Sequence, residues 1–360
     1  MARHCREVTR REGTAQTRMT PAGRSQVTSS RYADLSQSKG ETDAMRTCYS
    51  PSRRRVLAFS AGLAATAWLP GSPALAEEKT GPPSRLIARP IPHSGESLPS
   101  VGLGTSQVFE VGDDPARRKA CAEVIRTLVA GGGKLIDTAP SYGTAESVVG
   151  DLLAAAELRG RAFLATKLEE YDRNTGAAEL RASLQRLRSD RVDLMQVHNV
   201  NDSKQDLAML REWKSQGLCR YIGITTSFGG DFDAVEAVLR REKPDFLQVN
   251  YSLADRAAEK RVIPTATEVG AAVLTDLPFA RNRLFGAVRG RPLPEWASDF
   301  DATSWAQFFL KYLLGNEAVT AVIPGTSNSE HMADNLGAGR GRVPDAAQRR
   351  KMVAFFEALH

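Results

Sequence analysis

Short apolar runs alternate with amphipathic stretches from residue 85 to the end of the chain, and this alternation constrains the fold more than any other feature. Strands that alternate with helices form parallel sheets, because each helix returns the chain to the edge where the previous strand began. Eight apolar runs are predicted to be strands, and they span residues 101–104, 134–137, 163–166, 193–197, 221–225, 246–249, 272–275 and 318–323. Eight such units can close into a TIM barrel, which is the α/β fold we expect for residues 85–360.

The stretches between these runs repeat their apolar residues with helical spacing. Helices are therefore predicted at residues 116–130, 145–158, 178–187, 206–214, 231–241, 257–268, 304–314 and 345–359. The glycines at 131–133 are expected to end the first helix. Residues 91–98 have Ser94-Gly95 at their centre, which predicts a β-hairpin that caps the bottom of the (β/α)8 barrel ahead of its first strand.

An open, doubly wound parallel sheet is the alternative fold for such a pattern. A dinucleotide-binding sheet of that kind carries Gly-x-Gly-x-x-Gly directly after its first strand, at the start of a helix. Residues 101–105, Val-Gly-Leu-Gly-Thr, match this pattern only in part, and no long helix follows them directly. The barrel is therefore the better prediction.

The segment before the barrel has the order of parts found in a secretory signal. Ser52-Arg53-Arg54-Arg55 precedes the apolar run 56–69, and Ala74-Leu75-Ala76 precedes Glu77. The paired arginines, with Leu57 close behind, resemble a twin-arginine (Tat) signal. We therefore expect residues 45–76 to engage the twin-arginine export machinery, to be cleaved after Ala76 and to deliver the protein to the periplasm, with no stable membrane span afterwards. An uncleaved membrane anchor is the alternative.

Residues 1–44 show no hydrophobic periodicity and contain many Ser, Thr and Arg residues. Such a composition is typical of disorder. Signal peptides normally begin near the initiator methionine, so we expect Met45 to be the true start and residues 1–44 not to be translated. Residues 77–84 are expected to form a short flexible lead-in.

The net charge of +6 would suit a nucleic-acid-binding protein, but its distribution argues against that function. Residues 1–76 contain 12 Lys and Arg against 5 Asp and Glu, which leaves 36 basic and 37 acidic residues for the rest of the chain. The basic excess therefore belongs to the N-terminal segment, and no nucleic-acid partner is expected for the barrel.

Two of the four cysteines, Cys121 and Cys219, lie beyond residue 76. Their spacing matches no metal-binding or redox motif. A disulfide between them is one alternative, but two isolated buried thiols are the expectation, and no metal site is predicted.

Four polar residues fall where a barrel places its chemistry, at the carboxyl ends of the strands. Asp137 and Tyr142 follow the second predicted strand, Lys167 the third and His198 the fourth. Each has an ordinary structural explanation, as a turn cap, a loop anchor, a solvent-exposed amine or a structural histidine. Together, at the ends of three consecutive strands, they predict a catalytic site.

These residues lie in segments that resemble the aldo-keto reductase family. The matching segments are Asp137-Thr-Ala-Pro-Ser-Tyr142-Gly, Ala165-Thr-Lys167, Gln196-Val-His198-Asn199, the run 217–224 and the tail Val322-Ile-Pro-Gly-Thr-Ser-Asn328 with His331 to Asn335. The resemblance covers about residues 88–336 and keeps the family's order and spacing. It implies an NAD(P)-dependent oxidoreductase that reduces an aldehyde or ketone to an alcohol, with NADP as the expected cofactor and NAD as the alternative.

The roles of the four residues follow from the chemistry. Hydride transfer to a carbonyl carbon leaves charge on the oxygen, which a nearby acid must protonate. A tyrosine with a pKa of about 10 is a poor acid at neutral pH, and a neighbouring ammonium group lowers that pKa. We therefore predict that Tyr142 is the general acid, that Lys167 lowers its pKa, that Asp137 positions Lys167, and that His198 orients the substrate.

The resemblance also implies a cofactor site. The residues expected to bind the cofactor are Thr105, Thr225, Gln248, Thr275, Arg281, Gly325, Thr326, Ser327, Asn328, His331 and Asn335. Gln248 matches the residue that holds the nicotinamide carboxamide in the family, and Arg281 with Arg283 is expected to reach the pyrophosphate. The start of a helix near Glu330 would supply amide groups for an anion.

The cofactor site departs from the family pattern at three places. Thr225-Thr226 stands where Ser-Asn is usual, and Asp276 stands where an aromatic residue usually stacks on the nicotinamide. Tyr251 or Phe279 is the expected substitute for that ring. Gly325 and His331 stand where Lys and Arg usually surround the adenosine 2′-phosphate, which weakens discrimination between NADP and NAD.

These departures leave a second functional class open, a cofactor-binding sensor or subunit with little turnover. A barrel isomerase or aldolase that uses Lys167 as a Schiff-base amine is a third, but it explains neither Tyr142 nor His198. The loop 200–204 after the fourth strand is short, which predicts an open pocket for a small carbonyl substrate that the sequence does not identify.

Overall fold

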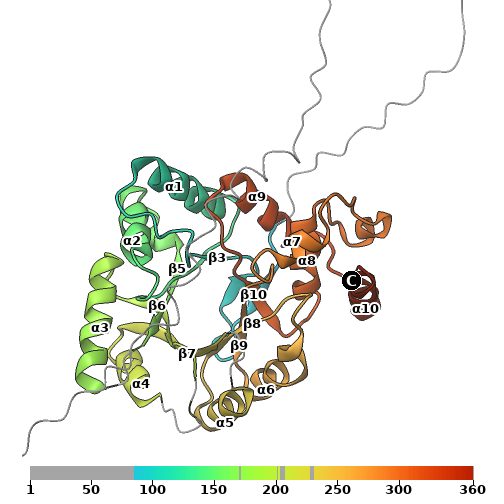
Figure 1. Ribbon diagram of the computed structural model, residues 1–360. Helices are drawn as coiled ribbons and strands as arrows, with labels where there is room; N and C mark the ends of the chain where they lie inside the picture. The colour runs from blue at the N-terminus through green and yellow to red at the C-terminus, as the bar shows by residue number, and fades with distance from the viewer. Residues whose placement is uncertain (1–84, 170–171, 201, 203–206, 228–230, 360) are drawn as a thin grey trace, which may run out of the picture. The chain divides into compact units, whose positions relative to one another are not determined.

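The computed structural model describes residues 85–169, 172–200, 202, 207–227 and 231–359, and the rest of the chain is drawn as a grey trace in Figure 1. The predicted signal peptide at 45–76, the segment 1–44 and most of the loop 200–204 lie outside the described residues.

Eight parallel strands lie at the centre of the molecule and pair in the order of the sequence. They are β3 (Leu103–Gly104), β4 (Leu135–Asp137), β5 (Phe163–Leu168), β6 (Val192–Val197), β7 (Cys219–Thr226), β8 (Phe246–Asn250), β9 (Ala272–Asp276) and β10 (Val319–Val322). Each falls on a predicted strand and differs from it by at most two residues at either end. The sequence pattern therefore located all eight strands.

The sheet closes between its first and last strands. Parallel bridges join Val101 to Val322 and Gly104 to Gly325. A Cβ atom on Gly104 would lie 2.8 Å from the carbonyl oxygen of Ile323, so only a glycine allows this approach. The predicted (β/α)8 barrel is confirmed, and the doubly wound alternative is excluded.

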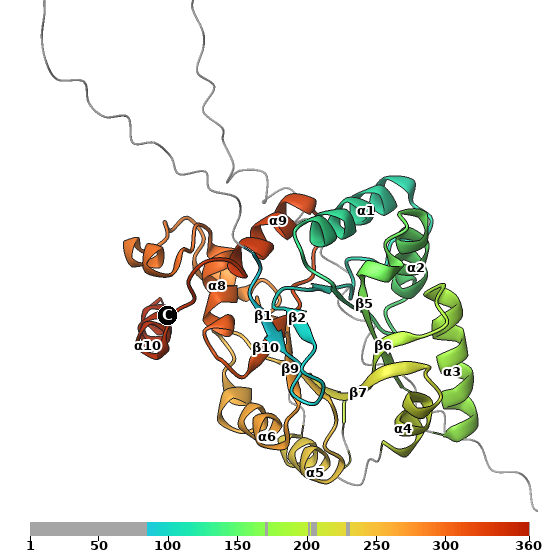
Figure 2. The same ribbon diagram turned by 180° about the vertical axis from the view of Figure 1, so that it is seen from behind.

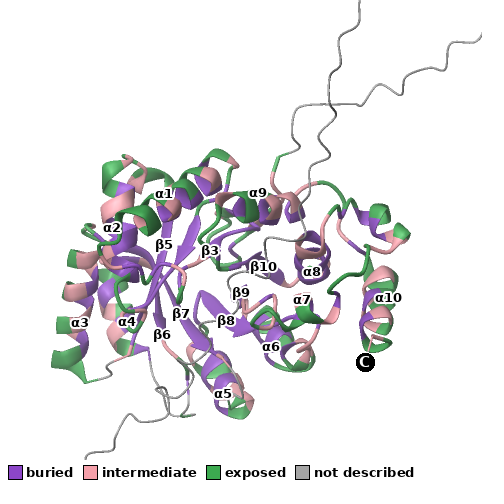
Figure 3. Ribbon diagram, turned by 45° about the horizontal axis from the view of Figure 1, so that its top comes forward, coloured by how far each residue is buried: buried purple, intermediate pink, exposed green. Residues whose placement is uncertain are grey.

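Helices surround the barrel, as Figures 1 and 2 show. They are α1 (Pro115–Ala130), α2 (Ala145–Ala155), α3 (Arg173–Arg186), α4 (Ala208–Ser215), α5 (Phe232–Glu242), α6 (Val262–Val269), α7 (Arg283–Ala287), α8 (Trp305–Leu314), α9 (Ser329–Ala338) and α10 (Ala346–Glu357). Figure 3 shows their buried sides against the buried strands and their exposed sides outward. No helix in the described ranges is long and apolar enough to cross a membrane.

Three predicted helices differ from the structure by more than two residues at one end or are divided, and the other five agree within two residues. The predicted helix 178–187 begins earlier, at Arg173, because the Asp172 side chain accepts hydrogen bonds from two amide groups of its first turn. The predicted helix 145–158 ends at Ala155, ahead of a left-handed residue at Glu157. The predicted helix 257–268 is divided at Arg261 into the 3₁₀ helix η3 (Ala257–Lys260) and α6.

Three short helical elements were not predicted: α7 and the 3₁₀ helices η2 (Arg159–Arg161) and η4 (Glu295–Phe300). Each spans six residues or fewer, which is too short to show a full apolar repeat in the sequence.

A hairpin of β1 (Ala88–Pro90) and β2 (Ser97–Pro99) precedes the barrel, as predicted. Its side chains Ile91 and Leu98 are buried together with Phe163, Tyr221 and Phe246 from the barrel strands. Figure 2 shows the hairpin in front of the strand ends. It therefore closes the amino-terminal end of the barrel, and the opposite end remains for a functional site.

Cys121 and Cys219 are buried and form no disulfide, which agrees with the prediction of two isolated thiols. Burial raises the pKa of Cys219 to about 12, so this thiol is not a nucleophile at neutral pH.

Candidate active site

The structure brings the four predicted catalytic residues together at the carboxyl ends of the strands. Asp137 is the last residue of β4, and Lys167 lies near the end of β5. The ammonium nitrogen of Lys167 donates hydrogen bonds to both carboxylate oxygens of Asp137, at 3.0 and 2.8 Å, and to the carbonyl oxygen of Thr138 at 2.9 Å. The exposed fractions are only 1% for Lys167 and 2% for Asp137, so this is a buried and fully engaged ion pair.

Tyr142 lies between Lys167 and His198. The chain turns after β4, where the amide of Tyr142 donates to the carbonyl oxygen of Ala139 and Gly143 takes a φ of 54°. The ammonium nitrogen of Lys167 is 4.9 Å from the centre of the Tyr142 ring. The rings of Tyr142 and His198 meet edge to face, with centroids 6.1 Å apart. The phenol, the amine and the imidazole therefore share one small space.

Electrostatics in this space differ from the prediction in one respect. Burial acts to lower the pKa of Lys167, but the charge of Asp137, Tyr142 and the hydrogen bonds outweigh it, so the pKa is raised and the amine stays charged. Burial raises the pKa of Tyr142, and the opposing effect of Lys167 does not overcome it. Lys167 therefore acts on Tyr142 in the predicted direction, but desolvation is the larger effect and leaves the pKa of Tyr142 above its usual value.

His198 is held by a carboxylate. It follows β6, and its Nδ1 atom lies 2.9 Å from Oε1 of Glu169. The amide of Ser141 donates to the same oxygen at 3.2 Å. Burial acts to raise the pKa of Glu169, but these hydrogen bonds outweigh it and the pKa is lowered, so the carboxylate is ionised. Glu169 thus keeps a proton on Nδ1, and a hydrogen bond from His198 to a substrate would use Nε2.

Two glutamines and a second aspartate extend the polar cluster toward the barrel axis. The side-chain amide of Gln196 donates to Oε1 of Gln248 at 3.0 Å. Gln248 in turn approaches Oδ2 of Asp276 at 3.3 Å and Oδ2 of Asp137 at 3.4 Å. Side chains from β4, β6, β8 and β9 therefore form one hydrogen-bonded group.

Several polar atoms of this region are buried without a partner. Among the described residues, the buried side-chain atoms that lack one are Ser100 Oγ, Thr138 Oγ1, Gln196 Oε1, Thr275 Oγ1 and Asp276 Oδ1. All except that of Ser100 belong to residues at the carboxyl ends of the strands. Gln196 and Asp276 belong to the hydrogen-bonded group described above. A buried polar atom without a partner costs free energy, so this group fits a polar ligand such as a nicotinamide cofactor.

The predicted cofactor residues in the strands differ in what they contact. The hydroxyl of Thr105 donates to the carbonyl oxygen of Asp137 at 2.9 Å, and that of Thr225 accepts from the amide of Asn199 at 2.8 Å. Both hydroxyls therefore hold the backbone beside the catalytic residues. Gln248 instead belongs to the cluster at the barrel mouth. Thr275 alternates with Leu274 and Asp276 on β9, so its side chain faces the outer core with Val273 and lies outside that cluster.

The remaining predicted cofactor residues form two groups near the mouth. Gly325, Thr326, Ser327, Asn328, His331 and Asn335 lie in the loop after β10 and in α9. The Asn328 side chain accepts from the amides of Glu330 at 2.8 Å and His331 at 3.4 Å, and so caps the start of α9. Arg281 and Arg283 line a separate pocket of about 310 Å³, together with Asn250 and Asp255.

The two proposed substitutes for a stacking ring have different surroundings. Tyr251 is fully buried, and its hydroxyl group forms hydrogen bonds with Glu259 of η3 and Arg349 of α10. Phe279 packs on Phe285, with ring centroids 4.9 Å apart. The expectation for Tyr251 is therefore wrong. Phe279 is partly exposed, and its role as a stacking ring stays a prediction.

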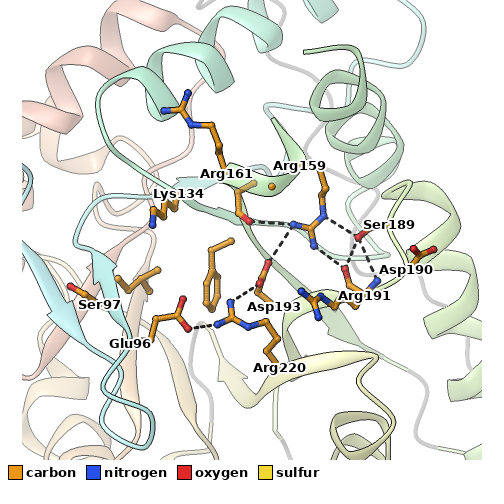
Figure 4. Close-up of a pocket in the computed structure, with 14 residues that line it drawn as sticks. Glu96, Ser97, Lys134, Arg159, Arg161, Ser189, Asp190, Arg191, Asp193 and Arg220 are labelled. Carbon is orange, nitrogen blue, oxygen red and sulfur yellow. Dashed lines mark hydrogen bonds and ion pairs between the residues drawn. The ribbon is translucent and has the colours of Figure 1, made fainter. Parts of the chain in front are cut away.

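A further pocket, of about 550 Å³, lies at the opposite end of the barrel (Figure 4). Its lining includes Phe163, Asp193 and Arg220 near the starts of β5, β6 and β7. Figure 4 shows Arg220 bonded to Glu96 and Asp193, and Arg159 directed at Asp193. These four charges neutralise one another and connect the hairpin to the barrel. We therefore interpret the pocket as a structural feature of the amino-terminal end of the barrel, the end that contributes stability in this fold.

Glu169 and Gln196 were not among the predicted site residues. Each lies two positions from one that was, Lys167 or His198. Alternate residues of a strand point to the same side, so this spacing is the signal that would have found them.

Comparison with known proteins identifies the family. Residues 100–348 match the model of the aldo/keto reductase family. Methylglyoxal reductase YeaE of Escherichia coli K12 is 29% identical over 255 residues, which cover 68% of this chain and 87% of the relative. An NADH-specific methylglyoxal reductase of the same strain is 28% identical over 231 residues, or 55% of this chain and 69% of that protein.

A solved structure shares the fold. It is an aldo-keto reductase from Klebsiella pneumoniae in complex with NADPH, which superposes with a TM-score of 0.63 at 22% identity. The superposition covers 76% of this chain and 95% of that one. The barrel and its order of elements are therefore shared with this protein.

Proposed function

This chain belongs to the aldo/keto reductase family, and on that premise we propose that it is an NAD(P)H-dependent oxidoreductase that reduces an aldehyde or ketone to an alcohol, with Tyr142 as the proton donor. The observation that carries the proposal is the buried Lys167–Asp137 ion pair beside Tyr142. The named methylglyoxal reductases among its relatives support small carbonyl compounds as the substrate class.

Each residue of the site has a separate role in the proposed reaction. A bound nicotinamide supplies the hydride. Tyr142 gives its proton to the carbonyl oxygen, and its raised pKa keeps it protonated at neutral pH until that oxygen becomes the stronger base. Lys167 stabilises the resulting phenolate, and Asp137 fixes Lys167. His198, held by Glu169, directs the carbonyl oxygen toward Tyr142.

The cofactor assignment rests on the cluster at the barrel mouth. The unpartnered Oε1 atom of Gln196 provides an acceptor for the amide group of a nicotinamide carboxamide, and the side chain of Gln248 lies beside it. NADP is the primary proposal, since the fold is shared with a reductase that was crystallised with NADPH. NAD is the alternative, since one relative is NADH-specific and His331 is exposed where a fixed cation is usual.

Replacing Tyr142 with phenylalanine tests this function. The change removes the proton donor and leaves the ring, so kcat should fall by about a hundredfold or more. The measurement is the loss of absorbance of reduced NADPH or NADH with methylglyoxal and other small aldehydes and ketones as substrates. Tyr221→Phe, at the opposite end of the barrel, is the matched control and should keep its rate within a small factor.

Two outcomes would count against the proposal. Near-normal turnover by Tyr142→Phe would show that another group donates the proton. If the unaltered protein binds the cofactor but reduces no carbonyl compound, a cofactor-binding sensor becomes the better account.

We also propose that residues 45–76 export the folded enzyme to the periplasm through the twin-arginine machinery, which then leaves a mature chain that begins at Glu77. The support is the order Arg53-Arg54, apolar run and Ala74-Leu75-Ala76 in the sequence.

A further inference from the structure

Asp276 has no role in the scheme above, although it lies in the middle of the site. It is the last residue of β9, and in the β8–β9 ladder it pairs with Asn250. Its Oδ2 atom accepts one long hydrogen bond, 3.3 Å, from Gln248. Its Oδ1 atom is buried and has no partner. One carboxyl oxygen is therefore available to a ligand at the barrel mouth.

The charges around Asp276 leave it as the surplus anion of the site. Gln248 on β8 contacts it directly, Asp137 on β4 repels it, and Lys167 on β5 attracts it. The charge of Asp276 acts to raise the pKa of Tyr142, which lies in the loop after β4. The single ammonium group of Lys167 is already bonded to both oxygens of Asp137. Lys167 is the cation that acts on the Asp276 carboxyl group, and Asp137 already engages it.

Burial raises the pKa of the Asp276 carboxyl group to about 7, and the charge of Asp137 adds to that effect. Its protonation state therefore changes in the physiological range. A ligand that brings a positive charge close to the carboxylate would favour the ionised form, and an uncharged ligand would leave it protonated to higher pH.

A nicotinamide ring changes its charge when it is oxidised, and a nearby carboxylate interacts differently with the two forms. The reduced ring is neutral, and the oxidised ring is a pyridinium cation. The carbon that gives the hydride must lie near a carbonyl whose oxygen is at Tyr142. Gln248 contacts both Asp276 and Asp137, and Asp137 holds Lys167 beside the Tyr142 ring. The carboxyl group and the ring must therefore share the barrel mouth.

We propose that the Asp276 carboxylate forms part of the nicotinamide site and favours the oxidised, positively charged ring over the reduced one. The inference rests on the proposed cofactor and adds a residue that determines which redox form the protein prefers. It follows that the preference grows as pH rises through neutrality, because only the ionised carboxylate attracts the cation.

Direct binding measurements test this proposal without turnover. The dissociation constants of NADP⁺ and NADPH would be measured with the full chain by calorimetry from about pH 5.5 to 8.5, on either side of the carboxyl pKa. The ratio Kd(NADPH)/Kd(NADP⁺) should rise by about tenfold across this range. In Asp276→Asn, which keeps the shape of the side chain, the ratio should be about tenfold lower at high pH and should not change with pH. The same titrations with NAD⁺ and NADH cover the alternative cofactor.

Asp190→Asn is the matched control, since it removes the same charge from an exposed residue at the opposite end of the barrel. Its ratio should follow that of the unaltered protein. A ratio that is the same in the unaltered protein and in Asp276→Asn would overturn the inference and leave the proposed function intact. Failure of the unaltered protein to bind any of these cofactors would instead overturn the proposed function.

Discussion

At the scale of single residues, burial and hydrogen-bond partners have opposite effects on the pKa of an acid, as Tyr142, Glu169 and Asp276 show. All three are acids at the same end of the barrel. Hydrogen bonds from His198 and Ser141 overcome the burial of Glu169 and lower its pKa. Lys167 acts to lower the pKa of Tyr142, and Gln248 that of Asp276, but desolvation and the charge of Asp137 outweigh them and raise both pKa values. The balance between burial, nearby charges and hydrogen bonds therefore decides which acids of this site hold their protons.

The raised pKa of Asp276 has a consequence for stability. The unfolded carboxyl group ionises near its ordinary pKa of 3.8, and the folded one near 7. Folding therefore becomes less favourable as pH rises through this window, and the cost is fully present above it. Asp276→Asn should stabilise the protein by about 1–2 kcal/mol more at pH 8 than at pH 5. Urea unfolding at the two pH values measures this difference, and an equal effect at both would contradict it.

The elements of the barrel follow from local rules. Asp114, Asp172, Asp231 and Asp345 each cap the start of a helix through hydrogen bonds to amides of its first turn. Where two helices pack closely, a small residue is also needed. Gly150 in α2 faces the end of α3, where a Cβ atom would lie 2.2 Å from the carbonyl oxygen of Arg186 and 2.7 Å from the backbone of Leu187.

Gly150→Ala should therefore destabilise the protein by about 1–3 kcal/mol, because backbone atoms of α3 would have to move away. Gly286→Ala in α7 is the matched control, since nothing lies within 4 Å of its Cβ position. That change should be neutral or slightly stabilising, because alanine favours helix more than glycine does. Denaturant unfolding of both variants measures the contrast, and equal midpoints would refute the packing argument.

At the scale of the whole molecule, one end of the barrel is closed by stabilising contacts and the other carries the candidate active site. The hairpin and the ion pairs of Arg159 and Arg220 close the amino-terminal end. The opposite end keeps unpartnered polar atoms and the reactive side chains. The chain before residue 77 carries 12 basic and 5 acidic residues, while the remainder is nearly neutral. This division suits a leader that is recognised separately from the enzyme.

Export is tested by replacing Arg53 and Arg54 together with lysine in a host that has the twin-arginine pathway. The unaltered protein should accumulate in the periplasm with Glu77 as its first residue, and the double variant should remain in the cytoplasm. Arg46→Lys, which precedes the pair, is the control and should be exported normally. A mature protein whose N-terminus maps elsewhere, or export of the double variant, would refute the assignment.

Much of the fold was predictable from the sequence because the signals are local. Apolar runs and helical periodicity located the eight barrel strands, and Asp137, Tyr142, Lys167 and His198 were recognisable by their positions after successive strands. Helix limits were less predictable where a cap or a left-handed residue decided them, as at Asp172 and Glu157.

The charges of the site depend on contacts between distant strands, which only the tertiary structure decided. Tyr142 and Lys167 could be paired from the sequence, but the net direction of the Tyr142 pKa could not, because it depends on how deeply the ring is buried. Likewise, Asp276 appeared as an unexplained departure until the closed barrel placed it beside Gln248 with one oxygen unpartnered. Desolvation is a property of the packed molecule, and no local pattern along the chain encodes it.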